Sequence, residues 1–217
     1  MKTMLTLLAR IGIAAVLLLP PPTVEAKAPD IAEVAALHQR AVAAQNAGDY
    51  EEAEHLHRKV VEAIGRVPDF PLNEQARQLS NLASVLNLRG KPIEALNLLR
   101  KAQSLLAKNP SQDPAQYSTL HFNLGQSYAL QGAWKSAEQQ FQEGMQVLRS
   151  AGVSDQTYFF ESDAGLAHVY WKTGRLGEAK SRYESAIRFV RTLVPPTHPV
   201  LRRWEQEYQA VMKELER

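Results

Sequence analysis

Apolar and polar positions alternate with a helical period along most of the chain. In its middle part, apolar side chains return every three or four positions, first at Leu120 and Leu124 and then at Phe141 and Met145. This spacing places them on one stripe of an α-helix. Gly132 stands between the two stripes, where the end of a helix favours a residue with positive φ. The pattern therefore predicts two helices that are joined by a short turn and pack antiparallel.

The same unit recurs with a period of 42 residues. One column of the repeat holds glycines, at Gly48, Gly90, Gly132 and Gly174. Five positions later stands a column of alanines, at Ala53, Ala95, Ala137 and Ala179. A small side chain at that position lets the two helices of a pair approach closely. Because one pair cannot bury its own apolar face, successive pairs are expected to stack on one another as an all-α solenoid.

The residues of the third unit resemble a known repeat. Its first helix reads His121-x-x-Leu124-Gly125-x-x-Tyr128 and its second reads Ala137-x-x-x-Phe141. This is similar to the tetratricopeptide repeat signature W-x-x-L-G-x-x-Y…A-x-x-x-F. The period of 42 resembles the long-helix subtype named after kinesin light chain, and Pro196-Thr197-His198-Pro199 is similar to the turn between those repeats. The resemblance implies a right-handed superhelical solenoid of four helix–turn–helix repeats with a C-terminal capping helix.

The predicted division of the chain follows the proline-rich and polar clusters between units. It comprises a signal peptide over 1–26, a degenerate first repeat over 27–71, three further repeats over 72–113, 114–154 and 155–196, and a capping helix over 197–217. The last helix has Leu201, Trp204 and Tyr208 on its apolar stripe, whereas Arg203 and Glu207 belong to its polar face. A polar outer face is what a cap exposed to solvent requires.

The first 26 residues have the pattern of a secretory signal peptide. An apolar run over 11–19 is followed by three prolines, and Val24-Glu25-Ala26 fits a cleavage site after Ala26. We expect a mature chain without a membrane span in the bacterial periplasm or outside the cell. The alternative is an uncleaved inner-membrane anchor, although the apolar stretch 5–19 contains Arg10 and is shorter than the roughly 20 residues that a spanning helix needs.

Composition excludes several kinds of chemistry. The chain has no cysteine, which excludes disulfides, thiolate metal sites and a cysteine nucleophile. The net charge is only +2 and no long basic run occurs, so nucleic acid is not an expected partner. There is no HExxH pair, glycine-rich phosphate loop or G-x-S-x-G turn. We therefore expect no enzymatic activity, no catalytic residue, no metal site and no cofactor.

The titratable residues of the first unit are interpreted as structural. His55 and His57 are two positions apart, which puts them on different faces of a helix. Glu51, Glu52 and Glu54 fall at the start of the second helix, where negative charge suits the helix dipole. We interpret these carboxylates as a face exposed to solvent.

The resemblance also implies where a partner would bind, because the first helices of such repeats line a concave groove. The positions expected in this groove are Arg77, Asn81, Ser84, Asn87, Phe122, Asn123, Gln126, His168, Trp171 and Lys172. Amides and hydroxyls suit the backbone of a largely uncharged, extended peptide, with Asn81 and Asn123 as the backbone contacts. Phe122 and Trp171 would anchor apolar side chains. Alternatively, the two asparagines bond neighbouring helices and Trp171 packs against the last helix.

These features predict a non-catalytic protein–protein interaction scaffold of the bacterial cell envelope, whose protein or peptide partner the sequence does not identify. Two alternatives stay open. One is a self-associating structural protein, a homo-oligomer built through the open ends of the solenoid. The other is an accessory subunit of an exported enzyme or of a secretion complex.

Overall fold

The computed structural model describes residues 31–108, 112–155 and 159–217, and their regular structure is helical throughout. The helices of these residues are, in chain order, α1 (Ile31–Asn46), α2 (Tyr50–Ile64), α3 (Leu72–Leu88), α4 (Pro92–Lys108), α5 (Pro114–Leu130), α6 (Trp134–Ser150), α7 (Phe160–Lys172), α8 (Leu176–Val190) and α9 (Pro199–Leu215). The predicted all-α fold is confirmed. The predicted signal peptide lies outside the described residues.

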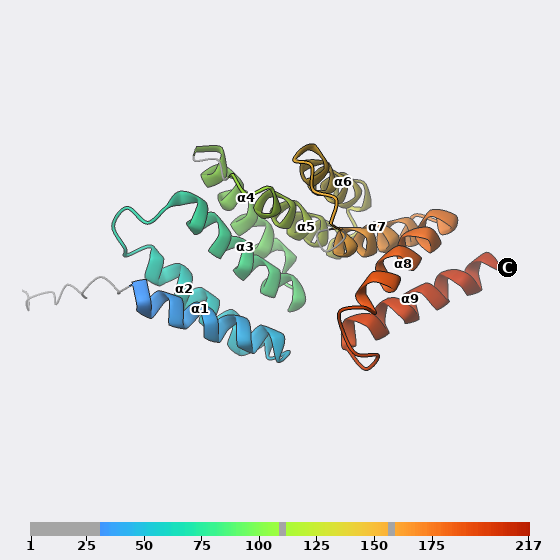
Figure 1. Ribbon diagram of the computed structural model, residues 1–217, viewed down its shortest axis with the longest axis horizontal. Helices are drawn as coiled ribbons and strands as arrows, with labels where there is room; N and C mark the ends of the chain where they lie inside the picture. Colours follow the sequence, from blue (N-terminus) through green and yellow to red (C-terminus); the bar gives the residue numbers. More distant parts are fainter. Residues whose placement is uncertain (1–30, 109–111, 156–158) are drawn as a thin grey trace, which may run out of the picture.

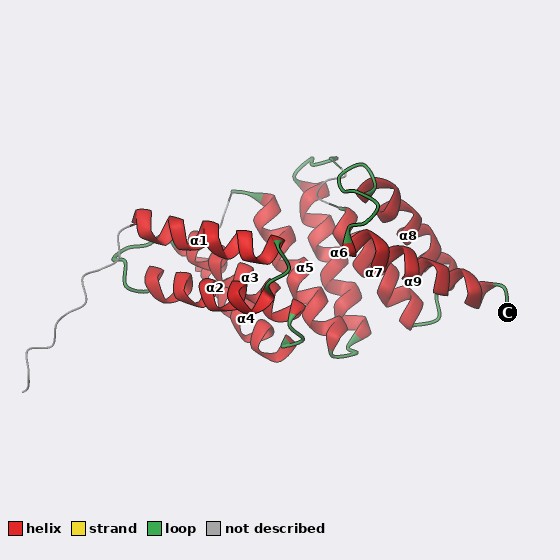
Figure 2. Cartoon of the chain, turned by 90° about the horizontal axis from the view of Figure 1, so that it is seen from below, coloured by secondary structure: helices red, strands yellow, loops and turns green. Residues whose placement is uncertain are grey.

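The helices pack in consecutive pairs, α1 with α2, α3 with α4, α5 with α6 and α7 with α8. They follow one another along the long axis of the molecule in chain order (Figure 2). Figure 1 shows the pairs as an arch, with α4 and α6 on its outer side and α1 and α9 at its two ends. Helix α9 packs on both α8 and α7, which is the place that the first helix of a further pair would take.

The glycine column makes the turn inside each pair. Its four glycines have φ between 70° and 80°, a conformation that costs glycine little and other residues more. In the third pair, Gly132 N–H donates to the carbonyl of Ala129, and Ala133 N–H donates to that of Tyr128, each at 3.0 Å. These two bonds make the glycine C-cap called the Schellman motif. The predicted role of the glycines as helix ends is confirmed.

The four residues of the alanine column have no exposed surface, as a position between packed helices requires. Nine positions after each glycine, a larger side chain fills the core of its repeat. These residues are His57, Leu99, Phe141 and Tyr183, each at most 1% exposed. The first repeat thus differs from the others in placing an imidazole where they place an apolar or aromatic side chain.

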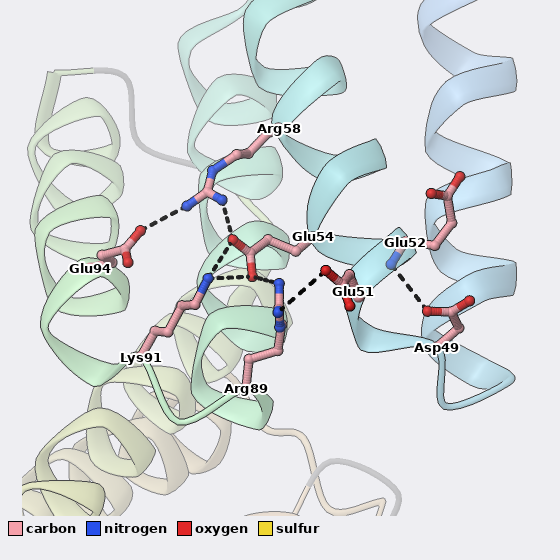
Figure 3. A network of polar contacts seen from close by, with 8 residues as sticks. All are labelled: Asp49, Glu51, Glu52, Glu54, Arg58, Arg89, Lys91 and Glu94. Carbon is pink, nitrogen blue, oxygen red and sulfur yellow. Dashed lines mark hydrogen bonds and ion pairs between the residues drawn. The ribbon is translucent and has the colours of Figure 1, made fainter.

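The interpretation of the first-repeat carboxylates as solvent-exposed was wrong for Glu54. Its side chain is only 4% exposed and accepts hydrogen bonds from Arg58, from Arg89 at 2.5 Å and from Lys91 at 2.9 Å (Figure 3). Burial by itself would raise the pKa of Glu54, but the bonds from Lys91, Arg58 and Arg89 outweigh it and lower the pKa to about 2. Because Arg89 and Lys91 belong to the turn after α3, this ionised carboxylate joins the first repeat to the second.

Candidate functional site

A groove of about 360 Å³ is formed mainly by α3, α5, α7 and α9. Its lining residues are Asn87 and Leu88 of α3, Phe122, Gln126, Ala129 and Leu130 of α5, Phe141 of α6, Glu161, Ala164, Gly165 and His168 of α7, and Arg203, Trp204 and Glu207 of α9. The groove is therefore built from every second helix of the solenoid. Only Phe141 comes from the second helix of a pair.

Four of the ten residues that the sequence placed in a groove line this one, namely Asn87, Phe122, Gln126 and His168. The other six do not line it. Among these, Arg77 lies 3.3 Å from Glu74 and 3.8 Å from Asp113, and the amide of Asn81 lies 3.4 Å from the side chain of Gln78. The predicted set is thus divided between this groove and positions outside it.

Asn87 and Asn123 are buried between α3 and α5 and bond one helix to the other. The Asn123 amide donates to the Ser80 carbonyl at 3.1 Å, and the Asn87 amide donates to the Asn123 carbonyl at 3.0 Å. The Ser127 hydroxyl donates to the Asn87 amide oxygen at 2.8 Å. This network agrees with the alternative interpretation of Asn123 as a contact between helices. Of the two amide side chains that line the groove, Asn87 is buried and Gln126 is the more accessible.

Trp171 and Lys172 lie at the end of α7, beside the groove. The Trp171 indole N–H donates to the Glu214 carboxylate of α9 at 3.0 Å, and the Lys172 ammonium lies 4.0 Å from the centre of the indole ring. The imidazole of His168 meets the same ring edge-on at 5.9 Å. Trp171 therefore fastens α9 to α7, as the alternative interpretation of this residue expected.

The apolar part of the groove wall is unusually open to solvent. Leu130 is 53% exposed and Leu88 is 40% exposed, although both belong to the ends of well-packed helices. On the same wall, the ring of Phe122 packs on Phe141 with a centroid distance of 5.8 Å. Apolar side chains that line a concave surface are typical of places where another molecule binds.

Helix α9 contributes two charged side chains, Arg203 and Glu207, that were predicted on its polar outer face. Glu207 is half-buried, accepts a hydrogen bond from the Tyr183 hydroxyl at 2.9 Å and lies 3.7 Å from His168. Burial raises the pKa of Glu207, but the nearby His168 ring and the hydrogen bond from the Tyr183 hydroxyl outweigh burial and lower it. The assignment of Glu207 to a solvating face was wrong, because its carboxylate contacts Tyr183 of α8 and lies near His168 of α7.

Glu161 is the second carboxylate of the groove and belongs to the first turn of α7. It makes no ion pair with the other described residues within 4.0 Å. Although its surface is open to solvent, the surrounding walls desolvate the carboxylate and raise its pKa. Of the two carboxylates in the groove, Glu207 therefore accepts a hydrogen bond, whereas Glu161 has no ion-pair partner among the described residues.

No group of three or more histidine, aspartate or glutamate side chains within 31–108, 112–155 and 159–217 is arranged to hold a metal ion. Over the same residues, no helix has both the length and the apolar character needed to cross a membrane.

Family models and one curated relative match the repeats. Models described as tetratricopeptide repeat match residues 34–67, 74–150 and 164–189. A relative from Arabidopsis thaliana, Protein KINESIN LIGHT CHAIN-RELATED 1, is 30% identical over 123 residues, which are 55% of this chain and 19% of the relative. The chain thus matches about a fifth of the length of that relative.

Solved structures share the fold at low sequence identity. BtubC (BKLC) from P. vanneervenii is 19% identical with a TM-score of 0.63, over 84% of this chain and 72% of that one. A Rap protein, solved in complex with competence and sporulation factor, is 12% identical with a TM-score of 0.72, over 87% of this chain and 51% of that one. At these identities the likeness shows a common solenoid fold.

Proposed function

Because this chain belongs to the tetratricopeptide repeat family, we propose that it is a protein–protein interaction scaffold that binds an extended peptide segment of a partner in the groove between α3, α5, α7 and α9. The observation that carries the proposal is the apolar wall of the groove, where Leu88 and Leu130 are exposed and Phe122 is half-buried. Gln126 stands on the same wall and offers both a donor and an acceptor to a peptide backbone.

The similar Rap protein supports this proposal, since that solenoid was solved with competence and sporulation factor bound. The present groove combines the two properties that peptide recognition needs. An apolar wall binds side chains through burial, and a few polar groups orient the bound chain.

The cellular location remains a proposal that rests on residues 1–26. We propose that the chain is exported, cleaved after Ala26 and active in the bacterial cell envelope. Expression of the full chain followed by cell fractionation and N-terminal sequencing tests this, and a mature protein that begins at Lys27 is the expected result. A membrane-bound chain that retains residues 1–26 would instead support the anchored alternative.

Replacing Leu130 by aspartate is expected to weaken partner binding at least about tenfold, because the wall loses an apolar contact and the new carboxylate must give up water in the closed interface. The measurement is capture from cell extract, followed by titration of the recovered protein against both forms of the scaffold. Ile93→Asp is the matched control, since Ile93 is 68% exposed and does not line the groove.

Equal binding by the Leu130→Asp variant and the wild type would show that the groove is not the binding surface. Recovery of this chain alone, with a mass that rises with its concentration, would favour the self-associating alternative.

A further inference from the structure

We propose that the peptide segment recognised in the groove carries a basic side chain close to an apolar one. The apolar side chain packs on Phe122 and Leu130, and the ammonium or guanidinium group pairs with Glu161. This inference rests on the proposed function, because it specifies the ligand of the same groove.

Glu161 is the group that selects for a cation. The other carboxylate of the groove, Glu207, is engaged by the Tyr183 hydroxyl and by His168. Glu161 makes no such contact with the described residues, although the groove walls raise the pKa of its carboxyl group. A cation placed beside it would stabilise the ionised form of the carboxylate and would pair with a group that has no ion-pair partner among the described residues.

The balance of charge favours a basic ligand over an acidic one. Glu161 and Glu207 face the groove from α7 and α9, whereas Arg203 is the one lysine or arginine side chain among its described lining residues. An acidic peptide would bring its carboxylate close to two others, and like charges at an interface suppress binding. The apolar wall and the carboxylate belong to one continuous groove, so a single short segment can reach both.

A display library of short random peptides, selected on the full chain, tests the proposal without assuming a sequence. We expect the enriched peptides to share lysine or arginine near a leucine, isoleucine or phenylalanine. Fluorescence anisotropy with labelled copies of these peptides should show about tenfold weaker binding to Glu161→Gln. Replacing the basic residue of the peptide by glutamine should cause a similar loss on the wild type but little further loss on Glu161→Gln.

Glu62→Gln is the matched control, because it removes the same charge from an exposed position of α2 whose ion pair with Arg66 is on the surface. It should leave peptide binding unchanged. Acidic or uncharged peptides that bind the wild type and lose affinity for Leu130→Asp would overturn the basic ligand but leave the groove as the binding site. Peptides insensitive to both Leu130→Asp and Glu161→Gln, or no enrichment at all, would overturn the ligand and the groove together.

Discussion

Replacing Gly165 by alanine is expected to lower the free energy of unfolding by about 2 kcal/mol, although alanine is the better helix former. A Cβ atom at Gly165 would lie 2.6 Å from the ring of Phe141. A Cβ atom at Gly125 would meet the same ring from α5 at 2.6 Å. Because the ring is held between two helices and is 1% exposed, it cannot move aside without shifting α5 or α7.

Urea unfolding followed by circular dichroism measures this effect. Gly177→Ala is the control, since its new methyl group would meet no atom within 4 Å and stability should stay equal or rise slightly. Phe141→Leu makes room for the new methyl group, so the two substitutions should not be additive. The double variant Gly165→Ala/Phe141→Leu should lose about 1 kcal/mol less stability than the sum of the two single losses. If the effects were additive, the contact between Gly165 and Phe141 would not be the cause.

Acid is expected to destabilise the first repeat through His57. This side chain is 1% exposed, and neither ring nitrogen has a hydrogen-bond partner among the described residues. Burial, together with the neighbouring His38 ring 6.0 Å away, lowers the pKa of His57 from 6.5 to about 4. The unfolded chain therefore takes up a proton before the folded one does. Stability is complete above pH 6.5 and falls as the pH drops towards 4, by up to about 3 kcal/mol.

Replacing His57 by leucine, the residue at the same position of the second repeat, should remove this dependence. It should also raise stability at neutral pH by about 1 kcal/mol, because two unpaired polar atoms leave the core. The measurement is the urea midpoint as a function of pH, with hydrogen exchange of α1 and α2 to locate the change. His55→Leu is the control, since His55 is exposed on the same helix.

A second acid transition should survive the His57 substitution. The pKa of Glu54 is lowered from 4.5 to about 2, so the stability from its contacts is complete above pH 4.5 and is lost as the pH falls towards 2. Protonation of His57 and protonation of Glu54 thus both lower the stability of the fold, the first as the pH falls from 6.5 towards 4 and the second as it falls from 4.5 towards 2. A pH profile between 6.5 and 4 that is identical in His57→Leu and the wild type would exclude His57 as the source of the first transition.

The helices, their pairing and the repeat could be predicted from the amino-acid sequence alone. Periodic apolar positions define the buried stripe of each helix, Gly132 and its counterparts need a positive φ, and Ala137 and its counterparts allow close packing. These are local requirements, and they recur every 42 residues, so one sequence is enough to recognise them. The resemblance to tetratricopeptide repeats placed Phe122, Gln126 and His168 in a groove, and these three residues line the groove described above.

The neighbouring helix that each polar side chain meets could not be predicted in this way, because it depends on how the repeats pack together. Periodicity identifies a face of a helix but not the neighbour that covers it, and this is why Asn123 turned out to bond α3 and Glu207 to line the groove. The same limit applies to Glu54, whose partners Arg89 and Lys91 are more than thirty positions away in sequence. The need for Gly165 likewise arises from a ring on another helix, because the space available to a side chain is a property of the packed repeats together.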